Sequence, residues 1–291
     1  MEILPFFLSG LLLGSIYGLS AVGLSFIFGV LKVANVGHGS LVMLGAYVAF
    51  FAFVGAGVVP FVSVVAAALI GGVIGYIVYF LVIKPLKYVG ELHILVALFA
   101  FGMLMAEGAR IAWGPDFVGY SWSLGSVEIG GLVVEFTKAA GAAAAAFIAV
   151  GFDQVLRRTY YGRAVRAVVQ DPVGAQVVGV DIEKIYASAT AIGMAIVAAS
   201  GVLITLFIPV GINPYMGGPY TLMAFVIAVM GGLGSVLGAY VAGLIFGLIS
   251  SLGYYIFSLL GFAEPSQMAL FLAFLILLLT LLLKPTGLFR L

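Results

Sequence analysis

The chain has 291 residues, of which 64% are hydrophobic and only 8% are charged, and its formal net charge is +1. Soluble domains carry about 25% charged residues, so this composition excludes an ordinary water-soluble fold, and the near-neutral charge gives no reason to expect a nucleic-acid partner. The sequence has no cysteine and only two histidines, which excludes disulfides, thiolate metal sites and a histidine-based metal centre.

Long uncharged stretches predict membrane-spanning helices, because about 20 apolar residues suffice to cross the hydrocarbon core. Turns rich in glycine and proline divide these stretches. The expected spans are 6–30, 39–55, 60–82, 92–112, 138–156, 185–208, 219–231, 236–258 and 266–284. The seventh is short enough to be a half-helix or a re-entrant segment, which would leave eight. We therefore expect an all-α polytopic bundle of about 8–9 transmembrane helices with broken or re-entrant segments, forming one transmembrane domain over 1–291.

Basic residues gather in the loops that nine crossings would place on one face. Of the twelve Lys and Arg residues, only Arg110 and Lys138 fall on the other face, beside the segment 113–137. The positive-inside rule makes the basic face cytoplasmic. We therefore expect the amino terminus outside and the carboxyl terminus inside.

The external segment, about 113–137, is expected to lie close to the membrane. Its tryptophans and Tyr120 favour the membrane–water interface. The alternation in 127–129 and 132–134 predicts a small hairpin that turns at Gly130-Gly131. The segment is too short to form a domain of its own.

Glycines at four-residue spacing predict close helix contacts, because small residues let backbones approach. The pairs are Gly10/Gly14, Gly14/Gly18 and Gly71/Gly75. Packing within one bundle and a dedicated dimer face both fit this spacing, and packing is the simpler interpretation. The pentapeptide Gly-Ala-Tyr-Val-Ala at 45–49 and 238–242 is a candidate internal repeat, in which both copies would run in the same direction.

Two polar or glycine-rich breaks are candidates for a translocation path. The first contains Asn35, His38 and Ser40, which either satisfy free backbone groups at a helix turn or line a water-filled path. The second consists of Gly231, Gly232, Gly234 and Ser235. A helix that begins at such a break directs a partial positive charge at a passing carboxylate, although glycines also permit close packing.

The loop 157–184 is the longest basic loop and has a predicted structure of its own. Asp171 before Pro172 is a helix-start signal, Gly179 is a helix-end signal, and Asp181 is expected to cap the next span. A structured basic loop suits the docking of a soluble partner, although basic residues beside a membrane also attract anionic lipids.

Several catalytic signatures are absent from the sequence. It contains no Gly-Lys-Ser or Gly-Lys-Thr, no His-Glu-x-x-His and no Gly-x-Ser-x-Gly, and no carboxylate lies deep in an expected span. We therefore expect no enzyme activity, no catalytic residue, no cofactor and no metal in this chain, and no proton coupling through buried acids.

An ordered set of motifs resembles the permeases of branched-chain amino acid ABC transporters. The motifs are Gly14-Ser15-Ile16-Tyr17-Gly18-Leu19, Phe28-Gly29-Val30, Asn35-Val36-Gly37-His38-Gly39, Met43-Leu44-Gly45-Ala46-Tyr47, Gly162-Arg163-Ala164-Val165-Arg166-Ala167, Gly231-Gly232-Leu233-Gly234-Ser235 and Lys284-Pro285-Thr286-Gly287-Leu288-Phe289. They extend over nearly the whole chain, and its length and carboxyl end resemble the shorter of the two permease types. Gly37, where alanine is expected, and Gln170-Asp171, where asparagine is more usual, depart from the pattern.

The resemblance implies a membrane subunit of an importer in the bacterial or archaeal inner membrane. It would pair with a second related permease, two cytoplasmic ATP-binding subunits and an external substrate-binding protein. The residues expected to couple it to an ATP-binding subunit are Gly162, Arg163, Arg166, Ala167, Asp171, Ala175 and Gly179.

Alternatives from other classes are a stand-alone secondary transporter or channel for a small polar solute, and a membrane scaffold that transports nothing. Within the family, urea, short amides and other amino acids are alternative substrates.

Overall fold

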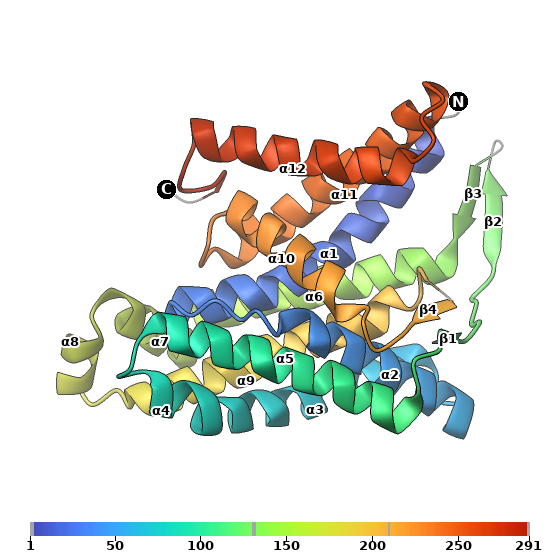
Figure 1. Ribbon diagram of the computed structural model, residues 1–291. Helices are drawn as coiled ribbons and strands as arrows, with labels where there is room; N and C mark the ends of the chain where they lie inside the picture. The colour runs from blue at the N-terminus through green and yellow to red at the C-terminus, as the bar shows by residue number, and fades with distance from the viewer. Residues whose placement is uncertain (1–2, 130–131, 209, 290–291) are drawn as a thin grey trace.

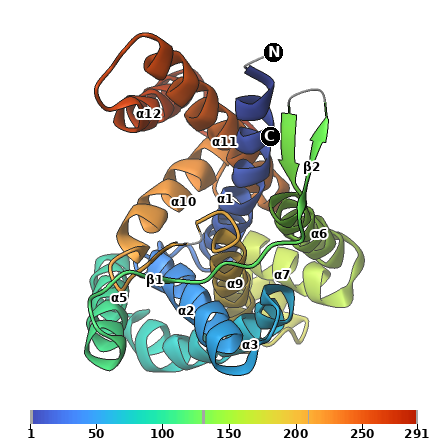
Figure 2. The same cartoon turned by 90° about the vertical axis from the view of Figure 1, so that its right-hand side faces the viewer.

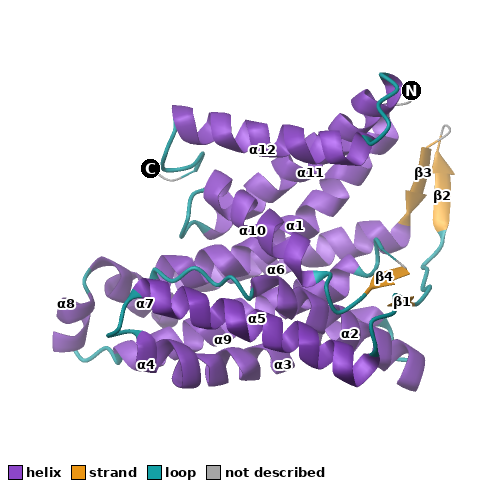
Figure 3. Cartoon of the chain, viewed as in Figure 1, coloured by secondary structure: helices purple, strands orange, loops and turns teal. Residues whose placement is uncertain are grey.

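The computed structural model describes residues 3–129, 132–208 and 210–289, and it is a helical bundle with two small two-stranded sheets (Figures 1 and 3). Within these residues eight helices are long and apolar enough to cross a membrane. They are α1 (Ile3–Leu31), α2 (His38–Ala56), α3 (Pro60–Val78) continued by a π-helical segment (Tyr79–Ile83) and α4 (Lys84–Leu86), α5 (Glu91–Trp113), α6 (Phe136–Arg158), α9 (Ile182–Ile204), α11 (Val236–Leu259) and α12 (Pro265–Leu283). The shorter α10 (Gly217–Gly231) takes the place of the short seventh span. The prediction of an all-α polytopic bundle is confirmed.

The bundle has two chemically different ends. One end carries α4 with α7 (Tyr160–Gln170) and α8 (Pro172–Val177), and the other carries strands β2 (Ser126–Ile129) and β3 (Leu132–Glu135) (Figure 1). We call them the basic end and the hairpin end. Arg110 and Lys138 lie at the hairpin end and Arg290 is outside the described residues, so nine of the twelve Lys and Arg residues lie at the basic end.

Helices α1 and α9 form the centre of the bundle (Figure 2). Within the 18-residue apolar window of each helix, 72% of the window is buried inside the protein in α1 and 78% in α9. In α12 the buried share is only 17%. The outer helices therefore leave apolar side chains on the outside of the bundle. Such a surface suits contact with lipid or with another membrane subunit.

Helices α2 and α10 both begin inside the bundle, at the same depth, and run in opposite directions. We call them the half-helices for that reason, although α2 has the 19 residues of a short span. His38, the first residue of α2, contacts Ser20 in the middle of α1, with 3.0 Å between Ser20 Oγ and His38 Nε2. The backbone N–H of Gly39 donates to Thr221 Oγ1 in α10 at 2.8 Å. Helix α2 then runs to the hairpin end, whereas α10 runs to the basic end (Figure 1).

The directions of α1, α2 and α3 are reversed, in the same order, in α9, α10 and α11, which is the topology of an inverted repeat (Figure 1). The two most extensive helix contacts are that of α1 with α11 and that of α3 with α9. The repeat relates these two contacts to each other, because it matches α1 with α9 and α3 with α11. The pentapeptide does not mark this repeat, because one copy lies inside α2 and the other at the start of α11. Both copies put glycine at a tight crossing, Gly45 against α9 and Gly238 against Gly231. Close packing therefore explains the sequence match. Both copies run toward the hairpin end, in the same direction as expected, because α2 and α11 share that direction (Figure 1).

The spaced glycines pack helix against helix inside the chain. A methyl group added to Gly14 would lie 2.7 Å from the carbonyl oxygen of Gly243 in α11. One added to Gly75 would lie 2.8 Å from the carbonyl oxygen of Thr190 in α9. Both distances are too short for a side chain, so these glycines serve the interior of the bundle, as the simpler interpretation predicts.

The external segment forms the expected hairpin and a strap over the bundle. Val127 pairs with Val134 in the antiparallel β2–β3 ladder, and the predicted turn at Gly130-Gly131 lies outside the described residues. Strand β1 (Val118–Gly119) pairs with β4 (Val210–Ile212), the strand that precedes α10. The part of the external segment that contains β1, which we call the strap, is therefore joined to the strand directly before α10.

Replacing Gly39 with alanine tests the contact between the half-helices. The new methyl group would overlap the carbonyl of Gly217, so we expect a loss of about 2 kcal/mol or more in stability. Gly55→Ala in the same helix is the matched control, because nothing lies within 4 Å of a methyl group there. Thermal unfolding of the purified variants in detergent measures both. Equal stability of the two variants would show that the half-helices do not meet as described.

Candidate functional site

The first polar break lies at the centre of the bundle, where α2 and α10 begin. Asn35 is 1% exposed and His38 is fully buried. Ser40 is also buried, and its hydroxyl donates to the carbonyl of Gly102 in α5 at 3.0 Å. These contacts, together with those to Ser20 and Thr221, connect four helices at one point. We call this point the central junction.

The central junction contains polar groups that packing leaves without partners. Within the described residues, the side-chain nitrogen and oxygen of Asn35 have no hydrogen-bond partner, and Nδ1 of His38 has none either. A buried unsatisfied polar group costs about 1–3 kcal/mol. Helix capping alone would not retain these side chains, so the junction holds free hydrogen-bonding capacity in the middle of the membrane.

The second break lies at the basic end, away from the central junction. Gly232 and Gly234 have positive φ angles of 96° and 93°, which let the chain turn sharply from α10 into α11. The hydroxyl of Ser235 caps α11 by accepting from the N–H of Gly238 at 3.1 Å. The two breaks that the sequence suggested for one path are therefore at different depths.

The partner of the first break is the start of α10, which begins two residues before the expected span 219–231. Gly217 and Thr221 contact Gly39 there, and Tyr220 lies 6.2 Å from Tyr17 between ring centroids. The signal that could have found it is the run Asn213-Pro214 followed by Gly217-Gly218-Pro219, which resembles the first break in composition.

A cavity of about 600 Å³ opens at the basic end. It brings together residues from both predicted sets: Gly162 and Arg166 of the loop, and Gly234 and Ser235 of the second break. The remaining lining residues are Phe26, Gly29, Val30, Lys32, Asp153, Leu156, Arg157, Val165, Val169, Gln170, Leu233, Val236, Leu237 and Phe289. We call it the basic-end cavity.

The predicted helix signals of the loop are confirmed. Thr159 caps α7 by accepting from the N–H of Gly162 at 3.2 Å, and Asp171 caps α8 by accepting from the N–H of Val173 at 3.0 Å. Gly179 follows α8 with a φ of 87°. Asp181 accepts from the N–H of Lys184 at 3.1 Å and starts α9. The loop is therefore a rigid structure outside the spans.

The remaining expected coupling residues divide between the buried and the exposed side of this loop. Ala175 is buried and bonds Asp171 through its N–H at 3.0 Å, and the carbonyl of Ala167 accepts from Asp171 at 2.9 Å. Arg163 is exposed and lies 5.8 Å from the ring centroid of Tyr160. The alanines thus hold the shape of the loop, and the arginine is available to a partner.

Helix α8 exposes apolar side chains at the outermost part of the basic end (Figure 1). Val173, Val177 and Val178 are 72%, 82% and 77% exposed. Helix α8 itself contains no basic residue. Apolar exposure in a structured segment beyond the spans is a property of protein-binding surfaces.

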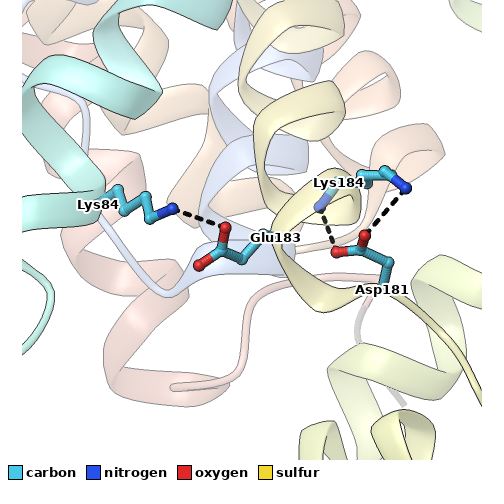
Figure 4. Close-up of polar contacts among 4 residues, drawn as sticks. All are labelled: Lys84, Asp181, Glu183 and Lys184. Carbon is cyan, nitrogen blue, oxygen red and sulfur yellow. Dashed lines mark hydrogen bonds and ion pairs between the residues drawn. The ribbon is translucent and has the colours of Figure 1, made fainter.

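Two ion pairs lie where this loop meets α9: one joins α4 to α9, and the other is local to the start of α9. Lys84 Nζ lies 2.7 Å from Glu183 Oε2, and Lys184 Nζ lies 3.1 Å from Asp181 Oδ2 (Figure 4). The hydrogen bond from the backbone N–H of Lys184, followed by its side chain, lowers the pKa of Asp181. Burial lowers the pKa of Lys87, against the opposing effect of Glu183. Because the exposed Lys84–Glu183 pair contributes only about 0.2–1 kcal/mol, it can break and reform during motion.

Among the described residues, no group of three or more His, Asp and Glu side chains could hold a metal ion. The arrangement offers buried hydrogen-bonding groups at mid-depth and a docking surface at one end.

Comparison with known proteins gives one consistent family. Residues 6–281 match the family described as "Branched-chain amino acid transport system / permease component". No solved structure matches the chain significantly.

Relatives come from bacteria and an archaeon. The chain is 30% identical to the high-affinity branched-chain amino acid transport system permease protein LivH of Salmonella typhimurium, over 96% of this chain and 92% of the relative. It is 28% identical to the corresponding protein BraD of Pseudomonas aeruginosa, over 96% and 93%. It is 26% identical to the probable permease LivH of Methanocaldococcus jannaschii, over 78% and 74%. The chain therefore belongs to the branched-chain amino acid transport system permease family.

Proposed function

We propose that this chain, as a single transmembrane domain over 1–291, is the permease subunit of an ATP-driven importer for branched-chain amino acids in the inner membrane. The substrate class is that of the named relatives. ATP is hydrolysed by separate cytoplasmic subunits, because this sequence has no phosphate-binding loop and is no enzyme itself. A second related permease and an external substrate-binding protein complete the importer.

The observation that carries this proposal is the composition of the docking surface at the basic end. Anionic lipid would attract Arg163, but it gives no reason for two exposed valines on a helix without a basic residue and a third directly after it. A protein surface accounts for both, because interfaces combine apolar contacts with arginine. We therefore assign α7 and α8 to an ATP-binding subunit, with Gly162, Ala167, Asp171, Ala175 and Gly179 maintaining their shape.

The central junction is proposed to form part of the translocation path when it opens. Two half-helix amino termini meet there, and such ends favour the carboxylate of an amino acid. The free groups of Asn35 and His38 would supply transient hydrogen bonds. Gly231, Gly232, Gly234 and Ser235 would act at the basic end of the same path as the turn on which α10 moves.

The docking assignment predicts the effect of Val177→Asp and of Arg163→Glu. We expect each to weaken retention of the ATP-binding subunits and substrate-stimulated ATP hydrolysis about tenfold, because a charge would replace an apolar or complementary contact. Val133→Asp is the control for retention of the ATP-binding subunits, since that valine is 62% exposed at the opposite end of the bundle. Normal assembly and hydrolysis in both loop variants would reject the assignment.

The junction assignment predicts that His38→Ala slows uptake about tenfold. The change removes the bond to Ser20 and leaves that hydroxyl buried without it, at a cost of roughly 1–3 kcal/mol. His93→Ala is the matched control, because His93 is exposed. His38→Gln, which keeps a hydrogen-bonding group, should recover part of the rate. Uptake per assembled complex that is unchanged in His38→Ala would assign His38 to packing alone.

The charge distribution supports an external hairpin end and a cytoplasmic basic end. Because the chain has no cysteine, single cysteines report the orientation directly. We expect Ser121→Cys to react with a membrane-impermeant maleimide in intact cells, and Gln176→Cys to react only after lysis. The reverse pattern would invert the proposed orientation, with the amino terminus inside.

A further inference from the structure

The basic-end cavity lies where membrane-spanning helices end. Its walls come from the last turns of α1 and α6, the first turn of α11, and one side of α7. The ends of spanning helices are at the depth of the lipid headgroups, where the hydrocarbon core gives way to water. A ligand of this cavity is therefore most easily supplied from the membrane itself.

The cavity has an excess of positive charge. Three cations line it, Lys32, Arg157 and Arg166, together with one carboxylate, Asp153, which leaves a formal charge of +2. Asp153 is buried and paired with Arg157, at 2.7 Å from its Nε. The carboxylate is thereby neutralised, and it does not oppose an anion bound at the other two cations.

The other two cations have donors to spare. Arg166 donates one N–H to the carbonyl of Leu156, and a guanidinium has five. Lys32 has no side-chain partner among residues 3–129, 132–208 and 210–289. The first turn of α11, through Val236 and Leu237, adds the partial positive charge of a helix amino terminus on the opposite wall.

Apart from Gln170 and Ser235, the rest of the lining carries no polar side chain. Phe26, Val30, Val165, Val169 and Phe289 line the cavity beside the cations. A free inorganic anion would fill only the charged part and leave these side chains against water. An amphiphile whose phosphate meets the cations and whose glycerol and first acyl carbons meet the apolar wall would fill both parts.

We infer that the basic-end cavity binds the phosphate of an anionic phospholipid. The lipid would contact α1, α6, α7 and α11 at once. It would therefore hold α7 at a fixed position relative to the start of α11. This site does not depend on the identity of the transported substrate.

The test is lipid retention by the purified full chain. The chain is exchanged from detergent into micelles that contain either phosphatidylglycerol or phosphatidylcholine, and the lipid retained per chain is counted by native mass spectrometry. We expect preferential retention of one phosphatidylglycerol. Removal of each cation should lower the affinity of the chain for phosphatidylglycerol about fivefold. This affinity should therefore fall about fivefold in Lys32→Gln and about 25-fold in the double variant Lys32→Gln with Arg166→Gln.

The control removes two cations at the hairpin end, by Arg110→Gln with Lys138→Gln, and should leave retention unchanged. Equal loss in this control, or full retention in the Lys32 and Arg166 variants, would overturn the site. Competition by millimolar inorganic phosphate or glycerol phosphate would overturn the assignment to a lipid in favour of a soluble anion. Release of the lipid on addition of ATP-binding subunits would give the cavity to that subunit and overturn the inference.

Discussion

The structure depends on one constraint: inside a membrane, backbone polar groups must be satisfied within the protein. Every interruption of a helix must therefore be covered by other helices, and the covering helices must come close. The glycines of α1 and α11, and those of α3 against α9, allow this approach because a methyl group on either side would touch a carbonyl. The tight frame they form shelters the two half-helices, whose first turns bond to each other and to Ser20.

The frame also decides where chemistry is available. At the central junction the backbone N–H groups of Gly39 and Ser40 already have acceptors, so the free capacity resides in Asn35 and His38. A zwitterionic amino acid with an apolar side chain needs few and transient contacts, and the described spans offer few. The junction is buried in this structure.

Helix α10 is the element that connects the two ends of the molecule. Before it, β4 pairs with the external strap; at its start it meets α2; and after it, Gly234 and Ser235 line the basic-end cavity beside α7. The N–H of Leu288 also donates to the carbonyl of Met230 at its end, at 2.8 Å. A shift of α7 by a docked subunit would therefore change the cavity between α7 and the turn after α10, and a bound lipid would connect the two walls.

The sequence alone determined the membrane class, the positions of the long helices, the hairpin, and the caps at Asp171, Gly179 and Asp181, because hydrophobicity and helix-end chemistry are local. It also found the motifs that identify the family. Only the tertiary structure decided that α2 and α10 meet head to head, that the repeat is inverted, and that Gly231–Ser235 lies with Arg166 and not with His38. Those facts concern which segments distant in sequence approach one another. A glycine in the sequence can indicate a close helix crossing, but it does not identify the helix on the other side.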